Sequence, residues 1–396
     1  MNLASPFSLA LGTIVALSLL GLPVGHAMIA GSVLYLWLAG LDMGTAAEQL
    51  LNGMYTSYLL LAIPLFILAA EFMNSGPIMD RLLRFCNALV GRWRGGLAQV
   101  NVVQSIIFAS MSGSALADAA ASGRLMQTLM TKDGRYTASF AAALTAVSSV
   151  IGPIIPPSIP LVLYSLVSDT SIGYLFLAGM VPGLLIGAVQ MSLIAFLAKR
   201  RNFPVEPAVS LRELPGITWQ AVPALMMPVI LLGCLYSGIT TPTEAAAAAA
   251  AYALLVSALL YRSVTWTGLY GSLLTSARTT ISIGMLIAGA LVFNYVITIE
   301  NIPKALAAMM KAYELSPLAF LLFANLVLLA LGCFLEGTTI LLVIVPVLVP
   351  TAQALGIDPV HFGVVAVVNI MIGALALITF VPDLVLFLPR LLGYKG

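Results

Sequence analysis

The sequence is short of charged residues. Only 8% of its 396 residues are charged, whereas 61% are hydrophobic, and soluble domains carry about 25% charged residues. The net charge of +2 is small, and no run of basic residues exceeds Lys199-Arg200-Arg201, which argues against nucleic acid as a partner. The composition therefore predicts a polytopic protein whose partner is the lipid bilayer.

Cysteine and histidine are also scarce. The three cysteines lie far apart, in or beside apolar stretches, which predicts buried free thiols: Cys86, Cys234 and Cys333. The two histidines, His26 and His361, stand 335 residues apart, and no HExxH or CxxC motif is present. We therefore expect no metal centre of the usual protein kind, no cofactor and no catalytic pair of an intramembrane enzyme.

Long apolar runs are abundant instead. A membrane-spanning helix needs about 20 apolar residues, and eight stretches qualify: 8–39, 54–73, 137–168, 172–198, 217–237, 242–261, 276–298 and 360–388. No Lys or Arg precedes the first stretch, which argues against a signal peptide, and Pro23 predicts that this first helix is kinked. The fold class is therefore an all-α polytopic membrane protein.

Two further apolar regions, 96–130 and 316–354, are interrupted near their middle. The interruptions are Ser112-Gly113-Ser114 and Glu336-Gly337-Thr338-Thr339. Short arms around a central break predict a re-entrant hairpin whose tip stops inside the membrane. The alternative is a pair of ordinary spans joined by a tight loop. The 16-residue arm 96–111 is short for a span, whereas 317–335 is long enough to be one.

Basic residues favour cytoplasmic loops, and they suggest how the two hairpins are oriented. Arg81, Arg84, Arg92 and Arg94 precede the first hairpin, and Lys132 and Arg135 follow it. Counting crossings from this side places both termini in the cytoplasm and makes the second hairpin open outward, with Lys304 and Lys311 as exceptions. Hairpins that enter from opposite faces indicate an inverted repeat. Its halves are 1–199 and 217–396, joined by a Pro-rich cytoplasmic linker, 200–216.

The breaks predict where a cation binds. Carbonyl and hydroxyl oxygens suit a hard cation such as Na⁺, so we expect a first sodium site at Ser112, Gly113, Ser114, Gly152 and Pro153. By the repeat, a second site is expected at Glu336, Gly337, Thr338 and Gly373. The alternative is that glycine and proline only pack or kink helices, since both are frequent in membrane helices.

A third set of residues is expected to face the substrate: Asp118, Arg124, Pro156, Pro157 and Ser158. The two charged residues lie in the second arm of the first hairpin, and charges inside apolar segments are functional candidates. They are expected to meet the substrate, or else to pair with each other as an internal salt bridge. Pro156, Pro157 and Ser158 are also expected to hold the second break open.

Five stretches carry a resemblance to a known family. They are LAIPLFILAAEFMNSG (61–76), GGLAQVNVVQSIIFASMSGSALADAAASG (95–123), SSVIGPIIPPSIPLVLYSLVSDTSIGYLFLAGMVPG (148–183), SGITTPTEAAA (237–247) and GIDPVHFGVVAVVNIMIG (356–373). In these stretches the chain resembles the large permease subunit of TRAP (tripartite ATP-independent periplasmic) transporters. The resemblance extends over nearly the whole chain.

The resemblance implies a mechanism and partners. It implies a bacterial or archaeal inner-membrane importer of an organic acid, such as a dicarboxylate or a sialic acid, with Na⁺ as the coupling ion. It also implies an elevator-type movement, a small four-helix membrane subunit and a periplasmic substrate-binding protein. The alternative within transport is a self-sufficient Na⁺/carboxylate symporter that needs no binding protein.

The chain departs from the family pattern in two places. Gln127-Thr128 stand where the family usually has Ile-Pro, and the Thr-Pro-Pro break that usually follows the stretch ending at Gly373 is absent, although Thr379 and Pro382 remain. The second departure predicts a shortened C-terminus and an altered second cation site. It leaves an inactive subunit as a further alternative.

Overall fold

Every regular element of the described chain is a helix. The computed structural model describes residues 5–380 except 57, 75, 208, 211 and 315, and the side chains of these residues except 56, 76, 121, 311 and 373–380. Within these ranges no strand occurs. Four of the described helices are long and apolar enough to cross a membrane, or six spans if each of two bent helix pairs counts as one. The predicted all-α polytopic membrane fold is confirmed.

The chain divides into two compact units, each described here by itself. The central unit is residues 51–285, and the terminal unit combines residues 1–50 with 286–396. These units do not follow the expected repeat halves, because each unit is defined by its packing rather than by an internal similarity. The division into halves at 200–216 remains a prediction.

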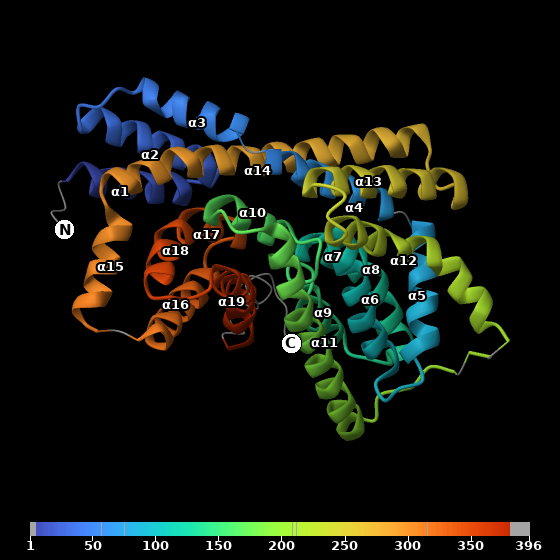
Figure 1. The fold of residues 1–396 in the computed structure, drawn as a ribbon. Coiled ribbons are helices and arrows are strands. Elements are labelled where there is room, and N and C mark those ends of the chain that lie inside the picture. The colour runs from blue at the N-terminus through green and yellow to red at the C-terminus, as the bar shows by residue number, and fades with distance from the viewer. Residues whose placement is uncertain are drawn as a thin grey trace. The chain divides into compact units, whose positions relative to one another are not determined.

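The central unit contains the first hairpin and its surroundings (Figure 1). Its helices are α4 (Ala62–Met73), α5 (Gly76–Val90), α6 (Gly96–Ser112), α7 (Ala115–Ala121), α8 (Gly123–Thr131), α9 (Ala138–Ser149), α10 (Ile159–Ser168), α11 (Ile172–Arg201), α12 (Leu214–Tyr236), α13 (Pro242–Leu255) and most of α14 (Trp266–Ile299). The predicted spans 172–198 and 217–237 correspond to α11 and α12. The predicted span 276–298 begins ten residues earlier, at Trp266.

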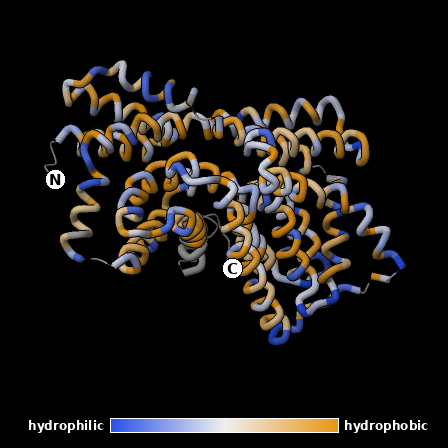
Figure 2. Tube along the Cα trace, in the orientation of Figure 1, coloured by the Kyte–Doolittle hydropathy of each residue, from blue (hydrophilic) through white to orange (hydrophobic). Residues whose placement is uncertain are grey.

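The terminal unit contains the second hairpin. Its helices are α1 (Pro6–Leu19), α2 (Val24–Leu38), most of α3 (Gly44–Thr56), the end of α14, α15 (Ile302–Ala312), α16 (Pro317–Gly332), α17 (Gly337–Val343), α18 (Val345–Ala354) and α19 (Pro359–Phe380). Figure 2 shows hydrophobic residues along most of these helices, as expected of helices in a bilayer. The predicted final span 360–388 runs beyond the described residues.

The prediction of one kinked helix over 8–39 is wrong. The chain turns back after Leu19, and α1 packs along α2 (Figure 1). A Cβ added to Gly31 would lie 2.9 Å from the carbonyl oxygen of Ala10, so the two helices are in close contact. Gly21 has φ +93° and closes α1 in a helix-ending turn, and Pro23 cannot extend that helix.

The turn changes the expected topology. Helices of 14 and 15 residues are about 21–23 Å long at 1.5 Å per residue, whereas the hydrocarbon core is about 30 Å thick. A hairpin of two such helices returns the chain to the side from which it came. The cytoplasmic side assigned to the N-terminal end therefore no longer follows from a count of crossings.

Helix α6 lies inside the central unit rather than against lipid. Its buried residues include four polar ones, Gln99, Asn101, Gln104 and Ser105. Apolar side chains of α5, α8, α9 and α11 surround this helix, among them Cys86, Met126, Met130, Leu144 and Ile194. Since polar groups in hydrocarbon need protein partners, such a helix is stable at membrane depth only as an internal arm of the fold.

Candidate functional site

The first predicted tip is a turn between α6 and α7. Helix α6 ends at Ser112, and Gly113 follows with φ +62°, the left-handed conformation that glycine adopts at low cost. Ser114 then caps α7, because its hydroxyl accepts a hydrogen bond from the backbone N–H of Ala117 at 3.3 Å. The sequence Ser-Gly-Ser thus ends one helix and begins the next within two residues.

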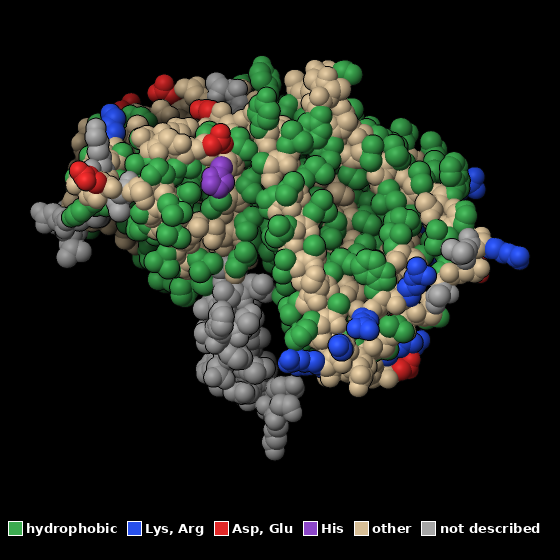
Figure 3. All heavy atoms as spheres, turned by 60° about the horizontal axis from the view of Figure 1, so that its bottom comes forward, with side chains coloured by type: hydrophobic (Ala, Val, Ile, Leu, Met, Phe, Trp, Pro, Cys, Tyr) green, Lys and Arg blue, Asp and Glu red, His purple; other side chains and the backbone are tan. Residues whose placement is uncertain are grey.

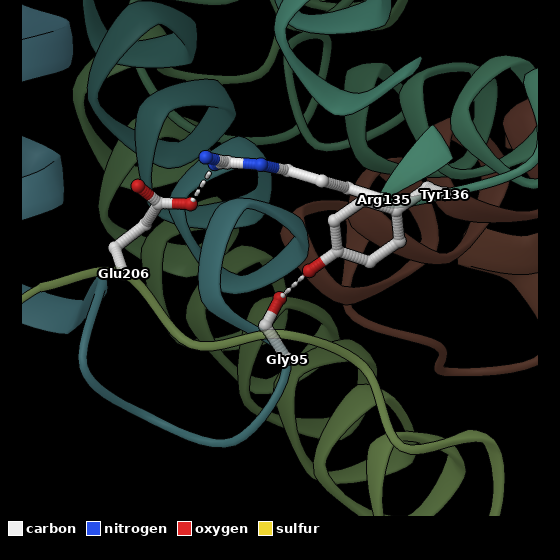
Figure 4. Close-up of polar contacts among 4 residues, drawn as sticks. All are labelled: Gly95, Arg135, Tyr136 and Glu206. Atoms are coloured by element: carbon white, nitrogen blue, oxygen red, sulfur yellow. Dashed lines mark hydrogen bonds and ion pairs between the residues drawn. The ribbon is translucent and has the colours of Figure 1, made fainter. Parts of the chain in front are cut away.

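The base of this hairpin confirms that the chain returns. The phenol of Tyr136, after α8, donates a hydrogen bond to the carbonyl of Gly95, just before α6, at 2.5 Å (Figure 4). Burial raises the pKa of Tyr136 to about 12, so the phenol remains a neutral donor. Beside it, Arg135 forms an ion pair with Glu206 at 2.7 Å. The two arms therefore start and finish at the same end of the unit.

Basic residues gather at this end. Glu206 lies in the segment that follows α11, so the basic C-terminus of α11 lies beside the base of the hairpin. The backbone N–H of Glu206 donates a hydrogen bond to the carbonyl of Gly91, close in sequence to Arg92 and Arg94. On the face seen in Figure 3, most of the visible Lys and Arg side chains lie toward one end, and hydrophobic side chains cover much of the rest of that face. That this end faces the cytoplasm remains a prediction from the distribution of basic residues.

The second break separates α9 from α10. Residues 150–158 are not helical, and residues 151–158 are all buried. Ser158 caps α10 by accepting a hydrogen bond from the N–H of Leu161 at 3.2 Å, and its hydroxyl donates to the carbonyl of Pro153. The predicted span 137–168 is therefore a broken helix, and its unwound part is covered by protein, as the membrane interior requires.

The two breaks are in direct contact. The N–H of Ile159 donates to the carbonyl of Gly113 at 3.4 Å, and a Cβ added to Gly113 would collide with the carbonyl oxygen of Pro157. From the other side, a Cβ on Gly152 would lie 3.1 Å from the backbone of Ser114. Both glycines are therefore needed for this close approach of two backbones. The predicted residues of the first site, with Pro156, Pro157 and Ser158, lie at or beside this contact.

The proposed salt bridge between Asp118 and Arg124 is absent. Asp118 is fully buried and accepts a hydrogen bond from the hydroxyl of Ser122 at 2.8 Å, whereas Arg124 on α8 is exposed. Six helical residues rotate a side chain by about 240°, so the two residues point in different directions. The prediction of an internal pair was wrong because the spacing does not suit one.

The second tip is also a break between two helices, but Gly337 is not left-handed and no side chain caps the helix that follows. Glu336 stands at the N-terminus of α17 with an exposed side chain that makes no capping hydrogen bond, Gly337 is buried and Thr338 is half-buried. A Cβ on Gly337 would lie 2.9 Å from the side chain of Ile370 on α19. The chain thus turns back between α16 and α17, and its tip packs on α19 close to Gly373, which itself lies outside the described side chains.

Sequence reasoning missed several buried polar residues below the first tip. Asn101 and Ser105 on α6 face Thr145 and Ser148 on α9, and hydrogen bonds join them. Their signal was present, because polar residues three or four apart in an apolar helix share one face. A search limited to charges, glycine and proline did not detect it.

Comparisons with known proteins agree with the geometry. The family model for the "Tripartite ATP-independent periplasmic transporter, DctM component" matches residues 11–376. The chain is 43% identical to a sialic acid TRAP transporter large permease protein of Vibrio cholerae, over 90% of this chain and 83% of that protein. It is 43% identical to a C4-dicarboxylate TRAP large permease of Pseudomonas aeruginosa, over 80% of this chain and 74% of that one.

A third relative has a different substrate in its name. A 2,3-diketo-L-gulonate TRAP transporter large permease protein of Escherichia coli is 38% identical, over 89% of this chain and 83% of its own length. The broken helices, the apolar spans and these matches lead to one conclusion. The chain belongs to the family of large permease components of tripartite ATP-independent periplasmic transporters.

Proposed function

We propose that this permease drives the import of an organic acid with the Na⁺ gradient. The observation that carries the proposal is the contact between the first tip and the unwound segment 150–158, through Gly113, Gly152 and Ile159. The carbonyls of Gly113 and Pro157 lie at this contact, and the hydroxyl of Ser158 lies beside it in the buried segment 151–158. Oxygen ligands of this kind suit a hard monovalent cation, which replaces its water shell with them.

Five residues would form the first Na⁺ site. Ser112, Gly113, Ser114, Gly152 and Pro153 would supply hydroxyl or carbonyl oxygens to Na⁺. The carbonyl of Pro153 also accepts a hydrogen bond from Ser158, which fixes its direction. A second Na⁺ would bind by analogy at Glu336, Gly337, Thr338 and Gly373. Binding of the ions would order both tips, and an elevator-type movement would then carry the site across the membrane.

The substrate class follows from the relatives. Sialic acid, C4-dicarboxylates and diketogulonate are all carboxylic acids, and each appears in the name of a relative that matches most of this chain. We propose that a carboxylate is also the substrate group here. Partners would be a small membrane subunit and a periplasmic binding protein, and the location would be the bacterial inner membrane.

A reconstitution experiment tests the coupling and the partners together. The chain is placed in proteoliposomes with and without the small membrane subunit and the loaded binding protein, and uptake of labelled sialic acid, succinate and diketogulonate is measured. We expect uptake of one acid only with both partners and an inward Na⁺ gradient. Full uptake by the chain alone would favour the self-sufficient symporter, and equal uptake with choline in place of Na⁺ would remove the coupling proposal.

Arg124 gives a prediction about the substrate. Its guanidinium is exposed on α8 and has no carboxylate partner in the described part of the chain. If it meets the substrate carboxylate, Arg124→Gln should raise the substrate concentration for half-maximal uptake roughly ten- to 150-fold at constant Na⁺, since hydrogen bonds to charged groups contribute about 1.5–3 kcal/mol. The matched control is Arg278→Gln on α14, which should leave that concentration unchanged. An unaltered value for Arg124→Gln would exclude the contact.

A further inference from the structure

The first hairpin is joined to the next helix by a buried polar contact, called here the first clamp: Asn101 and Ser105 on α6 with Thr145 and Ser148 on α9. The amide of Asn101 donates to Thr145 at 3.0 Å and its oxygen accepts from Ser148 at 3.2 Å. Ser105 donates to Ser148 at 3.1 Å. All four side chains are buried, so this polar contact lies among apolar helices.

The second hairpin has a corresponding contact, called here the second clamp: Asn325 on α16 and Asn369 on α19. The amide of Asn369 donates to the side-chain oxygen of Asn325 at 2.9 Å and to its own helix at Val365. Both side chains are half-buried. As in the first hairpin, the contact joins the first arm to the helix that follows the second arm.

The two clamps have the same spacing along the sequence from the predicted tips and glycines. Asn101 lies eleven residues before Ser112, and Asn325 lies eleven residues before Glu336. Ser148 lies four residues before Gly152, and Asn369 lies four residues before Gly373. The second arms also correspond, because α7 and α17 are both seven-residue helices followed by a short break. The correspondence is one of spacing along the chain, because α6 ends at Ser112 whereas α16 ends at Gly332, and Gly373 lies within α19 whereas Gly152 follows α9.

Contact between apolar helix faces alone does not fix how far one helix is shifted along the other. Two apolar helices in a bilayer can slide by a residue, about 1.5 Å, with little change in burial, whereas a hydrogen bond between them is satisfied in one register only. A shift of that size would exceed the tolerance of about 0.5 Å within which a binding site must be held. The first clamp joins the arm that carries the first tip to the helix that leads into the unwound segment with Gly152, and the second clamp joins the first arm of the second hairpin to α19, on which that tip packs.

We propose that the two clamps, Asn101–Ser148 and Asn325–Asn369, are equivalent positioning contacts that set the Na⁺ affinity of the two sites. The inference rests on the proposed function, since it assigns a role to these residues only if Na⁺ binds at the tips. In this proposal none of the six clamp residues is a ligand of the ion. Each acts through the helix register of its own hairpin.

The test measures Na⁺ binding by the full-length chain in detergent. The unfolding temperature is recorded against NaCl, with choline chloride holding the ionic strength constant. The variants Asn101→Leu, Ser148→Ala, Asn325→Leu and Asn369→Leu should each raise the half-saturating Na⁺ concentration about three- to fifteenfold, the range expected for one hydrogen bond between membrane helices. Ser148→Thr keeps the hydroxyl and should restore the wild-type value.

Combinations and controls separate positioning from general stability. Asn101→Leu with Ser148→Ala should act as one change, whereas Asn101→Leu with Asn325→Leu should multiply their effects. The controls Ser192→Ala and Thr298→Val remove exposed hydroxyls that bond only to their own helices, and should leave the Na⁺ dependence unchanged. If Asn101→Leu folds too poorly to measure, Ser148→Ala is the variant to use, and Ser148→Thr is its matched control.

The outcomes distinguish the clamps from the transport mechanism. A wild-type chain without any Na⁺-dependent stabilisation would overturn the proposed coupling, and the clamp proposal with it. A wild-type response to Na⁺, together with unchanged half-saturation in the variants and a lower unfolding temperature in choline alone, would overturn the clamp proposal and leave the coupling intact.

Discussion

Replacing Gly113 by alanine should abolish Na⁺-dependent uptake. The residue has φ +62°, where a Cβ costs about 1–2 kcal/mol, and the added Cβ would collide with the backbone oxygen of Pro157. A backbone atom cannot rotate away as a side chain can, so the tip and the unwound segment must separate. The measurement is uptake into proteoliposomes against external Na⁺, with membrane insertion checked by fractionation.

The chain provides a matched control for this substitution. Gly134 has φ +68°, but a Cβ there would meet no atom within 4 Å. Gly134→Ala therefore carries the same backbone strain without the collision, and uptake should remain close to that of the wild type. Wild-type Na⁺ dependence in Gly113→Ala would show that the contact between the two breaks is not needed for coupling.

Ser114→Leu should also abolish Na⁺-dependent uptake while leaving the protein in the membrane. The substitution removes a hydroxyl that caps α7, which costs about 1 kcal/mol, and it places a bulky apolar group where the proposed ion ligands converge. Ser114→Thr keeps an oxygen for both roles and should retain most of the uptake. The comparison of the two variants at several Na⁺ concentrations is the measurement.

A third variant separates the loss of the hydroxyl from the added bulk of leucine. Ser114→Ala adds no bulk and loses only the hydroxyl, so it should need more Na⁺ for half-maximal uptake yet reach a measurable rate. If Ser114→Leu instead transports with unchanged Na⁺ dependence, Ser114 does not belong to the site. Loss of insertion in Ser114→Leu alone would indicate a folding role for the tip.

The fold was largely predictable where the signals were local. Apolar runs, Gly113 and the prolines after Gly152 predicted the broken helices, because each acts on the backbone within a few residues of its own position. The prediction of a single first span was wrong, although its signals were also local. Pro23 was interpreted as a kink, but Gly21 just before it allows a complete reversal. The hydropathy of residues 8–39 is the same for a bent helix and for two short antiparallel ones.

The sequence by itself determined the membrane class, the helical content, the positions of both tips and the family, since these depend on composition and on short motifs. Only the tertiary structure decided that Gly113 meets Pro157, that Asp118 bonds to Ser122 instead of Arg124, and that Asn101 bonds to Thr145 and Asn325 to Asn369. These are contacts between side chains or backbones on different helices, or on different faces of one arm. Their geometry is set by how whole helices pack, and no local pattern specifies that packing.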